Sequence, residues 1–360
     1  MAIEWLAGNR LRGTTAERPS ASLQSPSVGG WVEVGRTTLG SNSSSISVDS
    51  LADKRYYMIL SDFQVQGTNN DHSWRFNNDS GSNYATRYNY NGGSDGTFTS
   101  QGQIVANGGT ASRPNLNIVY VANKSNKEKL LMSHINQSNS SGAGDTMTRS
   151  ENVGKWANTS NAINRIDAVT SNGGGYNSGS EVVVLGWDPS DSHTTNFWEE
   201  LASVDWSSGK NISTGTFTPK KYLWVQAWMT KTGTTGGSVY LRAGNSTVDT
   251  GSNYAHRYNI NGGSDGTQTS NSNGWFLDQG SSAGTDQWFL NAFFINNSGN
   301  EKLGIMHNTW VDDPTASYAP GRTEHVGKWA NTSDQINIFD INGLTIDDFT
   351  GGQIKVWGAD

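Results

Sequence analysis

The chain has 360 residues and a formal net charge of −7, with 16% charged and 33% hydrophobic residues. It contains 43 Gly and no Cys, together with 14 Trp, 12 Tyr and 11 Phe. The lack of Cys excludes disulfides, thiolate metal sites and thiol nucleophiles, and the mild, dispersed negative charge argues against non-specific binding of nucleic acids or anionic membranes. Many aromatic residues in a polar, Gly-rich chain favour an all-β fold with short strands and long turns.

Residues 1–30 differ in composition from the rest of the chain. They contain no uninterrupted apolar segment, and no run of 18 apolar residues occurs elsewhere, so we expect neither a classical signal peptide nor a membrane span. Two interpretations are open: a floppy leader, or an arm that docks into a neighbouring subunit, with residues 19–30 as its tether. The anchoring residues of such an arm would be Ile3, Trp5, Leu6, Arg10, Leu11 and Arg12.

Residues 31–190 are expected to form a first module of short strands at spacings typical of a β-sandwich. The expected strands cover residues 32–36, 55–61, 74–77, 84–90, 117–122, 130–134 and 181–185. Residues 91–96 read NGGSDG, which predicts a hairpin turn because Asn and Gly accept the positive φ that such turns need.

The same module is written twice in the chain. Residues 81–100 read GSNYATRYNYNGGSDGTFTS and residues 251–270 read GSNYAHRYNINGGSDGTQTS, with seventeen of the twenty positions identical. The sequence VGKWANTS also occurs twice, at residues 153–160 and 326–333. Two matches in the same order, at nearly equal offsets, indicate the tandem duplication of one domain.

The duplication predicts two tandem β-sandwich domains of the jelly-roll type, at residues 31–190 and 191–360, preceded by an extended N-terminal arm. No long amphipathic helix is expected. Three segments could each form one short turn or helix, at residues 160–166, 197–204 and 334–339.

Several polar and aromatic residues recur in both copies at an offset of 173. A catalytic set could have this composition, but an ion pair and a hydrogen-bonded His that hold a long loop against the sheet would recur for the same reason. Duplicated catalytic sites also usually diverge, so we interpret the set as structural. Its members are His134, Arg149, Glu151 and Trp156 in the first copy, and His307, Arg322, Glu324 and Trp329 in the second.

Four Asp residues flank the repeated GSNY segment: Asp79 and Asp95 in one copy, and Asp249 and Asp265 in the other. If the two carboxylates of a copy met at a turn, they could hydrolyse glycosides or hold Ca²⁺. No EF-hand or nonapeptide spacing is present, and turn capping is the favoured interpretation. Ca²⁺ is the one cofactor that the sequence leaves open.

Aromatic residues that differ between the copies are candidates for specialised binding. Trp74 has no aromatic counterpart in the second copy, and Trp310 replaces Gln137 of the first. Trp310 lies in NTWVDDP, where an exposed ring beside Asn and Asp would suit the face of a pyranose; packing or a protein interface is the alternative. Because no P-loop, GxSxG, HExxH or dinucleotide motif is present, no catalytic residue is assigned and no enzymatic activity is expected.

The sequence RFNNDSGSNYATRY at residues 75–88, followed by NGGSDG, resembles the concanavalin-like or jelly-roll modules of virion surface proteins from marine tailed phages. Such modules occur in tail fibres, tail-associated proteins and capsid decorations. IEWLAGNRLRGT at residues 3–14 resembles the short N-terminal segment with which such proteins begin.

The resemblance implies a virion structural protein that is assembled in the host cytoplasm and released by lysis. Its expected partners are other virion proteins: capsid, tail, or copies of itself in a homo-oligomer or a lattice. Neither a nucleic acid nor a membrane is an expected partner. The alternative is a lectin-like receptor-recognition protein that binds a cell-surface glycan.

Overall fold

The chain is described here from a computed structural model. The described residues are 4–6 and 10–12 (backbone only), 30–66, 71–106, 113–170, 174–191, 196–280, 284–311, 316–317 and 319–360. Within these ranges the structure is all-β and contains no helix, which confirms the all-β part of the expected fold. The described part of the chain accordingly has no helix that could span a membrane.

The first half, residues 30–191, forms two antiparallel sheets. The larger has the order β3-β15-β5-β10-β11-β12-β7-β8, with β14 also paired to β5, and the smaller has the order β4-β13-β6-β9. The strands are β3 (Val32–Thr38), β4 (Ser45–Val48), β5 (Tyr56–Gln66), β6 (His72–Phe76), β7 (Tyr84–Tyr90), β8 (Gly96–Gln101), β9 (Ile104–Ala106), β10 (Pro114–Ala122), β11 (Lys129–Ser138), β12 (Met147–Trp156), β13 (Ile166–Thr170), β14 (Gly175–Tyr176) and β15 (Glu181–Trp187).

The second half, residues 196–360, also forms a large and a small sheet. The larger has the order β16-β28-β18-β24-β25-β26-β21-β22, and the smaller has the order β17-β27-β19-β20, with β23 also paired to β19. The strands are β16 (Glu199–Trp206), β17 (Asn211–Ser213), β18 (Tyr222–Gly233), β19 (Gly237–Asn245), β20 (Thr247–Val248), β21 (Tyr254–Ile260), β22 (Gly266–Asn271), β23 (Trp275–Gly280), β24 (Gly284–Ile295), β25 (Lys302–Val311), β26 (Gly321–Trp329), β27 (Ile338–Leu344) and β28 (Phe349–Ala359).

The two larger sheets have the same order of corresponding strands. β7 and β21 begin at the Tyr of the two GSNY segments. Each pairs with the strand that ends in the repeated Trp: Tyr84 lies opposite Trp156, and Tyr254 opposite Trp329. Each half has its own buried apolar cluster, which includes Trp74, Phe76 and Ile166 in the first half.

The three segments expected to form one short turn or helix each contain no helix, and one of them is a strand. Residues 199–206 form β16, which pairs with β28 at the edge of the larger sheet, so hydrogen bonds to a neighbouring strand replace those of a helix. Residues 160–165 and 334–337 have no regular secondary structure. Here Asn158 Oδ1 accepts hydrogen bonds from the backbone of Ser160 and Asn161. Such local Asn turns compete with helical hydrogen bonding.

The NGGSDG segment forms the expected hairpin turn in both copies. Asn91 and Gly92 have φ values of 51° and 70°, and Asn261 and Gly262 have values of 51° and 74°. Positive φ at both central residues is the geometry of a type I′ turn, whose twist matches that of the flanking strands.

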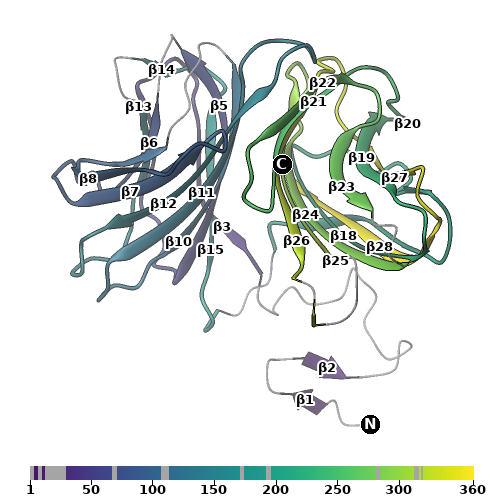
Figure 1. The fold of residues 1–360 in the computed structure, drawn as a ribbon. Coiled ribbons are helices and arrows are strands. Elements are labelled where there is room, and N and C mark those ends of the chain that lie inside the picture. Colours follow the sequence, from purple (N-terminus) through teal and green to yellow (C-terminus); the bar gives the residue numbers. More distant parts are fainter. Residues whose placement is uncertain are drawn as a thin grey trace.

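The larger sheets of the two halves pack against each other. Figure 1 shows the first half, coloured purple to teal, beside the second, coloured green to yellow. A third buried apolar cluster lies between them and contains Leu60, Leu116 and Ile118 of one half with Phe293, Ile305 and Val326 of the other. No strand pair joins the halves within the described ranges. Side-chain packing holds them together, with single backbone hydrogen bonds such as that from Ser270 N to Ala143 O at 2.7 Å.

Polar side chains complete this interface. Asn136 Nδ2 donates hydrogen bonds to the carbonyl oxygens of Gly304 at 2.8 Å and Gly327 at 2.7 Å. Glu181 accepts from Tyr222 Oη at 2.8 Å and from Lys221 Nζ at 2.9 Å. These donors and acceptors are therefore paired across the boundary between the halves.

The proposed anchor at the N-terminus is described only in part. β1 (Glu4–Leu6) and β2 (Arg10–Arg12) pair as an antiparallel hairpin, with Trp5 opposite Leu11 and Leu6 opposite Arg10. Ile3 and residues 13–29 lie outside the described residues. The role of these residues as an anchor stays a prediction.

Candidate functional site between the two halves

The residues shared by both copies meet where the two larger sheets face each other. His134 on β11 lies opposite Glu151 on β12, and His307 on β25 lies opposite Glu324 on β26. Each copy thus contributes one cross-strand His–Glu pair. The sequence interpretation had an ion pair and a His hold a long loop against the sheet. Instead all four residues lie on strands, and β11 continues to Ser138, beyond the expected end at residue 134.

Arg149 connects the two halves through its guanidinium group. Nη2 donates to Asp265 Oδ1 at 2.8 Å, while Nη1 donates to Glu151 Oε1 at 2.5 Å and to Glu324 Oε2 at 3.1 Å. The side chains of Arg149 and Asp265 are only 4% and 2% exposed. A buried cation that contacts three carboxylates holds the strands of both halves at fixed positions.

The second copy uses its equivalent residues differently. Arg322 forms an ion pair with Glu324 but is mostly exposed. Asp95, the counterpart of Asp265, is 49% exposed and lies 3.5 Å from Arg87. Equivalent residues of the two copies therefore lie in different environments. Arg149 and Asp265 face the other half, whereas their counterparts Arg322 and Asp95 do not.

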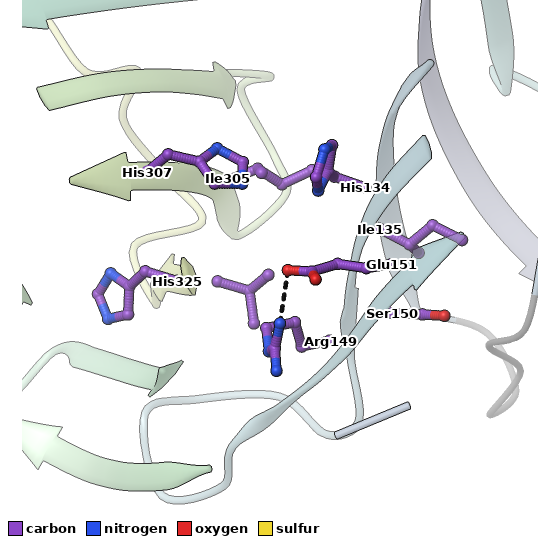
Figure 2. Close-up of a pocket in the computed structure, with 9 residues that line it drawn as sticks. His134, Ile135, Arg149, Ser150, Glu151, Ile305, His307 and His325 are labelled. Atoms are coloured by element: carbon purple, nitrogen blue, oxygen red, sulfur yellow. Dashed lines mark hydrogen bonds and ion pairs between the residues drawn. The ribbon is translucent and has the colours of Figure 1, made fainter. Parts of the chain in front are cut away.

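His134 and His307 contact each other across the interface, with ring centroids 4.6 Å apart and an interplanar angle of 73°. Figure 2 shows His134, Arg149 and Glu151 on one side of a small pocket, with His307 and His325 on the other. Burial, together with the neighbouring His134 and Arg149, lowers the pKa of His307 to about 3. Burial also lowers the pKa of His134. Both imidazoles are therefore neutral at physiological pH.

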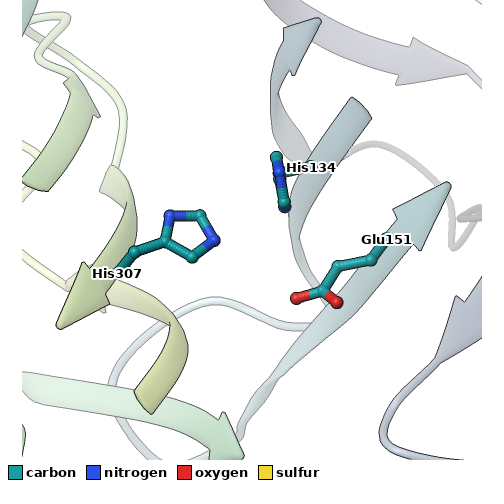
Figure 3. A group of neighbouring side chains, drawn as sticks. All are labelled: His134, Glu151 and His307. Carbon is teal, nitrogen blue, oxygen red and sulfur yellow. The ribbon is translucent and has the colours of Figure 1, made fainter. Parts of the chain in front are cut away.

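Three of these side chains have a composition suited to a metal ion. One donor atom from each of His134, Glu151 and His307 lies within 4.8 Å of the others. Figure 3 shows the two imidazoles and the carboxylate directed toward one shared space. The sequence contained all three residues, but nothing local in it indicated that His307 would lie beside His134.

The four Asp residues do not form carboxylate pairs. Asp79 lies before β7 and Asp95 beyond its far end, so about 20 Å of extended strand separates them. Asp79 accepts hydrogen bonds from Gly81 N at 2.8 Å, Asn83 Nδ2 at 2.9 Å and Trp156 Nε1 at 2.7 Å. Asp249 repeats these contacts with Gly251, Asn253 and Trp329. Asp79 and Asp249 thus cap turns, as the favoured interpretation had it, and also hold a core Trp.

The two Trp residues considered for glycan binding are buried. Trp74 lies on β6 inside the smaller sheet, between Ile104 and Ala168 on the neighbouring strands, and packs on Phe63. Trp310 lies on β25 rather than in a loop, and its ring covers Gly321, its cross-strand neighbour, which has no side chain to displace it. Neither ring is available to stack on a sugar.

An exposed aromatic pair lies elsewhere on the second half. Trp228 on β18 and Phe289 on β24 are direct cross-strand neighbours and are 49% and 46% exposed. The next position along each strand on the same face is polar, with Gln226 and Asn291 joined at 3.2 Å. Sequence comparison of the copies does flag Trp228, since Asp62 occupies this position in the first copy, but it could not rank it above the other Trp residues.

Comparison with known proteins identifies no relative. No protein-family model matches the chain, and no curated protein matches it. Among solved structures, Neisserial surface protein A aligns at 8% identity and a TM-score of 0.14, covering 80% of this chain and 97% of its own. Mouse laminin α1 domains LG4-5 align at 9% identity and a TM-score of 0.16, covering 91% and 89%. Likenesses this weak support no conclusion about fold or function.

Proposed function

We propose that this protein is a non-enzymatic structural protein displayed on the surface of a tailed-phage particle. In this proposal its two halves are duplicated β-sandwich domains of the jelly-roll type, and residues 1–30 attach it to the particle or to a neighbouring subunit. It would be assembled in the host cytoplasm and released by lysis.

The observation that carries the proposal is the buried contact between the halves around Arg149. Arg149, Asn136 and Glu181 of the first half each bond across the boundary to the second. A single rigid unit with two similar halves suits a particle surface, where shape and mechanical stability matter more than internal motion. Tandem binding modules on a flexible linker would not need such matched polar contacts.

The carboxylates considered for catalysis have structural partners in this proposal. Asp79 and Asp249 cap turns, and Glu151, Glu324 and Asp265 all contact Arg149. A glycosidase would need two carboxylates at a defined separation in an open site.

The proposal is tested on particles. An antibody raised against residues 196–360 should label intact virions in lysates of the bacterium that produces this chain. Recovery of the protein only from the soluble fraction, with unlabelled particles, would contradict the proposed location.

A second experiment tests the arm in the full-length chain. If residues 1–30 attach the protein, then Trp5→Asp should reduce incorporation into particles while leaving unfolding of the rest of the chain unchanged. Equal incorporation of the variant and the wild type would remove the arm from the proposal.

The alternative function, carbohydrate binding, is favoured by one observation, the exposed pair formed by Trp228 and Phe289. Two adjacent rings on a sheet face, beside the amide side chains of Gln226 and Asn291, match what a sugar surface requires: flat apolar contact with nearby hydrogen-bonding groups. Both functions can belong to one particle protein.

A further inference from the structure

We propose that His134, Glu151 and His307 bind a divalent transition-metal ion, of which Zn²⁺ is the type, and that the ion links the two halves of the protein. This site goes beyond the structural and glycan-binding functions, since neither requires a metal.

The strands place the three donors with little freedom. His134 and Glu151 are cross-strand neighbours on β11 and β12, and His307 comes from β25 of the facing sheet. Their donor atoms lie within 4.8 Å of one another, whereas ligands of one Zn²⁺ at about 2.0–2.2 Å would be about 3.3 Å apart. The donor atoms would therefore have to come closer by up to about 1.5 Å on binding, which the proposal assigns to rotation of the three side chains.

The donor types select the metal. Two imidazoles and one carboxylate suit Zn²⁺ and related transition metals, while Ca²⁺ and Mg²⁺ take oxygen ligands. Three protein ligands also leave a further position for water.

The two imidazoles lack other polar partners. Neither His134 nor His307 forms a hydrogen bond with any residue that the structure describes, and their closest aromatic contact is with each other. Two half-buried imidazoles turned toward one carboxylate without hydrogen bonds form an arrangement that a bound cation would satisfy.

Glu151 is also held in position for such a role. Arg149 Nη1 donates to Oε1 of Glu151 at 2.5 Å. The other carboxylate oxygen, Oε2, is the one that would bind the metal ion. Hydrogen bonds of this kind to a ligating group orient it toward a metal. The surrounding charges balance, because Arg149, Arg257 and Arg322 face Glu151, Glu324 and Asp265.

The duplication supplies a matched control. Glu324 is the repeat counterpart of Glu151 and also contacts Arg149, but it is not part of the three-residue group. Replacing Glu324 therefore removes a carboxylate from the same charge network without removing a proposed ligand.

The experiment uses the tag-free, full-length protein, treated with chelator and titrated with ZnCl₂ by calorimetry at neutral pH. We expect one ion per chain and an increase in the unfolding midpoint, because a ligand that binds only the folded state stabilises it. Co²⁺ in place of Zn²⁺ should give visible absorption bands that report the donors.

Variants decide whether these residues are the ligands. His307→Ala and Glu151→Gln should weaken Zn²⁺ binding by about 100-fold or more, since even residues that only orient a ligand contribute 10–100-fold. Glu324→Gln should bind as the wild type does. Circular dichroism and the unfolding midpoint of each metal-free variant establish that it is folded.

Three results would overturn the assignment: no binding of Zn²⁺ by the wild type, unchanged binding by a folded His307→Ala variant, or an equal loss in Glu324→Gln. The last would show that the ion responds to the charge network rather than to the three donors.

Discussion

Arg149 on β12 and Asp265 in the turn after β21 form an ion pair of 2.8 Å between the two halves, in which both side chains are nearly inaccessible to solvent. Their repeat counterparts, Arg322 and Asp95, are exposed and contact other residues. Arg149 of the first copy and Asp265 of the second therefore form a buried ion pair, whereas Arg322 of the second copy and Asp95 of the first do not pair with each other.

This asymmetry predicts different costs for one substitution at two equivalent positions. Asp265→Asn removes the most buried of the three carboxylates that contact Arg149 and should lower the free energy of unfolding by about 1.5–3 kcal/mol. Asp95→Asn removes an exposed contact and should change it by less than about 1 kcal/mol. Urea unfolding of both variants measures the difference; similar values would show that the pair does not stabilise the interface.

Asn136 predicts a second effect at the interface. Asn136→Ala removes the hydrogen bonds to the carbonyl oxygens of Gly304 and Gly327, and each lost bond should cost about 0.5–1.5 kcal/mol. Thr309 occupies the equivalent position in the second copy and is exposed, so Thr309→Ala is the control and should have little effect. Calorimetric unfolding compares the two, and a separate transition for each half would further indicate that their coupling has weakened.

Two buried histidines predict a loss of stability in acid. His72 contacts Phe63 and Tyr176, and His256 contacts His325 and Tyr258. Burial lowers the pKa of His72 and of His256 to about 3. An unfolded imidazole titrates near 6.5, so between these values the unfolded chain binds more protons. The stabilising contribution is complete above pH 6.5 and is lost as the pH falls toward 3.

A His72→Phe variant isolates one of these groups, since its neighbours are aromatic. Between pH 6 and pH 4 the wild type should lose about 1.4 kcal/mol per pH unit more than the variant. Unfolding by denaturant at several pH values gives both slopes. Parallel slopes would mean that His72 is not held neutral by the fold. Comparing the two proteins removes the contribution of carboxylates such as Asp340, whose pKa burial raises.

The exposed aromatic pair predicts where a glycan would bind. Trp228→Ala should abolish retention of the protein on any polysaccharide that the wild type binds, because stacking of the ring on a sugar face is lost. Tyr90→Ala is the control, as Tyr90 is also exposed but lies on the first half. Affinity electrophoresis through gels with and without polysaccharide measures retention. If both variants are retained as the wild type is, the binding surface lies elsewhere. If both lose retention equally, the loss does not report binding at Trp228.

Local features of this protein could be read from its sequence. Strand β7 covers Tyr84–Tyr90, as expected, and the turn that follows it has the expected positive φ values at Asn91 and Gly92. Asp79 caps a turn whose partners are only two and four residues away. Such contacts form within a short segment, so the residues that make them are visible together in the sequence.

The aromatic residues show where this kind of reasoning failed. Trp74 and Trp310 are buried, whereas Trp228 is exposed. Neighbouring residues do not separate them, since the exposed Trp228 stands between Ala227 and Met229 while the buried Trp74 stands between Ser73 and Arg75. Strand alternation only assigns side chains to two faces. Which face meets a core, the other half or solvent depends on how the sheets pack, and a short sequence window does not contain that information.

The sequence by itself determined that one β module occurs twice, because repeated strands, turns and caps are local and are written out in both copies. Only the tertiary structure decided what each copy does with them. Leu130, Met132 and Val153 are exposed in the first half, while their counterparts Leu303, Ile305 and Val326 are buried against it. The physical reason is that the two halves use different parts of their equivalent sheet surfaces to contact each other. The buried ion pair of Arg149 and Asp265, the contact between His134 and His307, and the exposure of Trp228 and Phe289 therefore all depend on packing between segments that are distant in sequence.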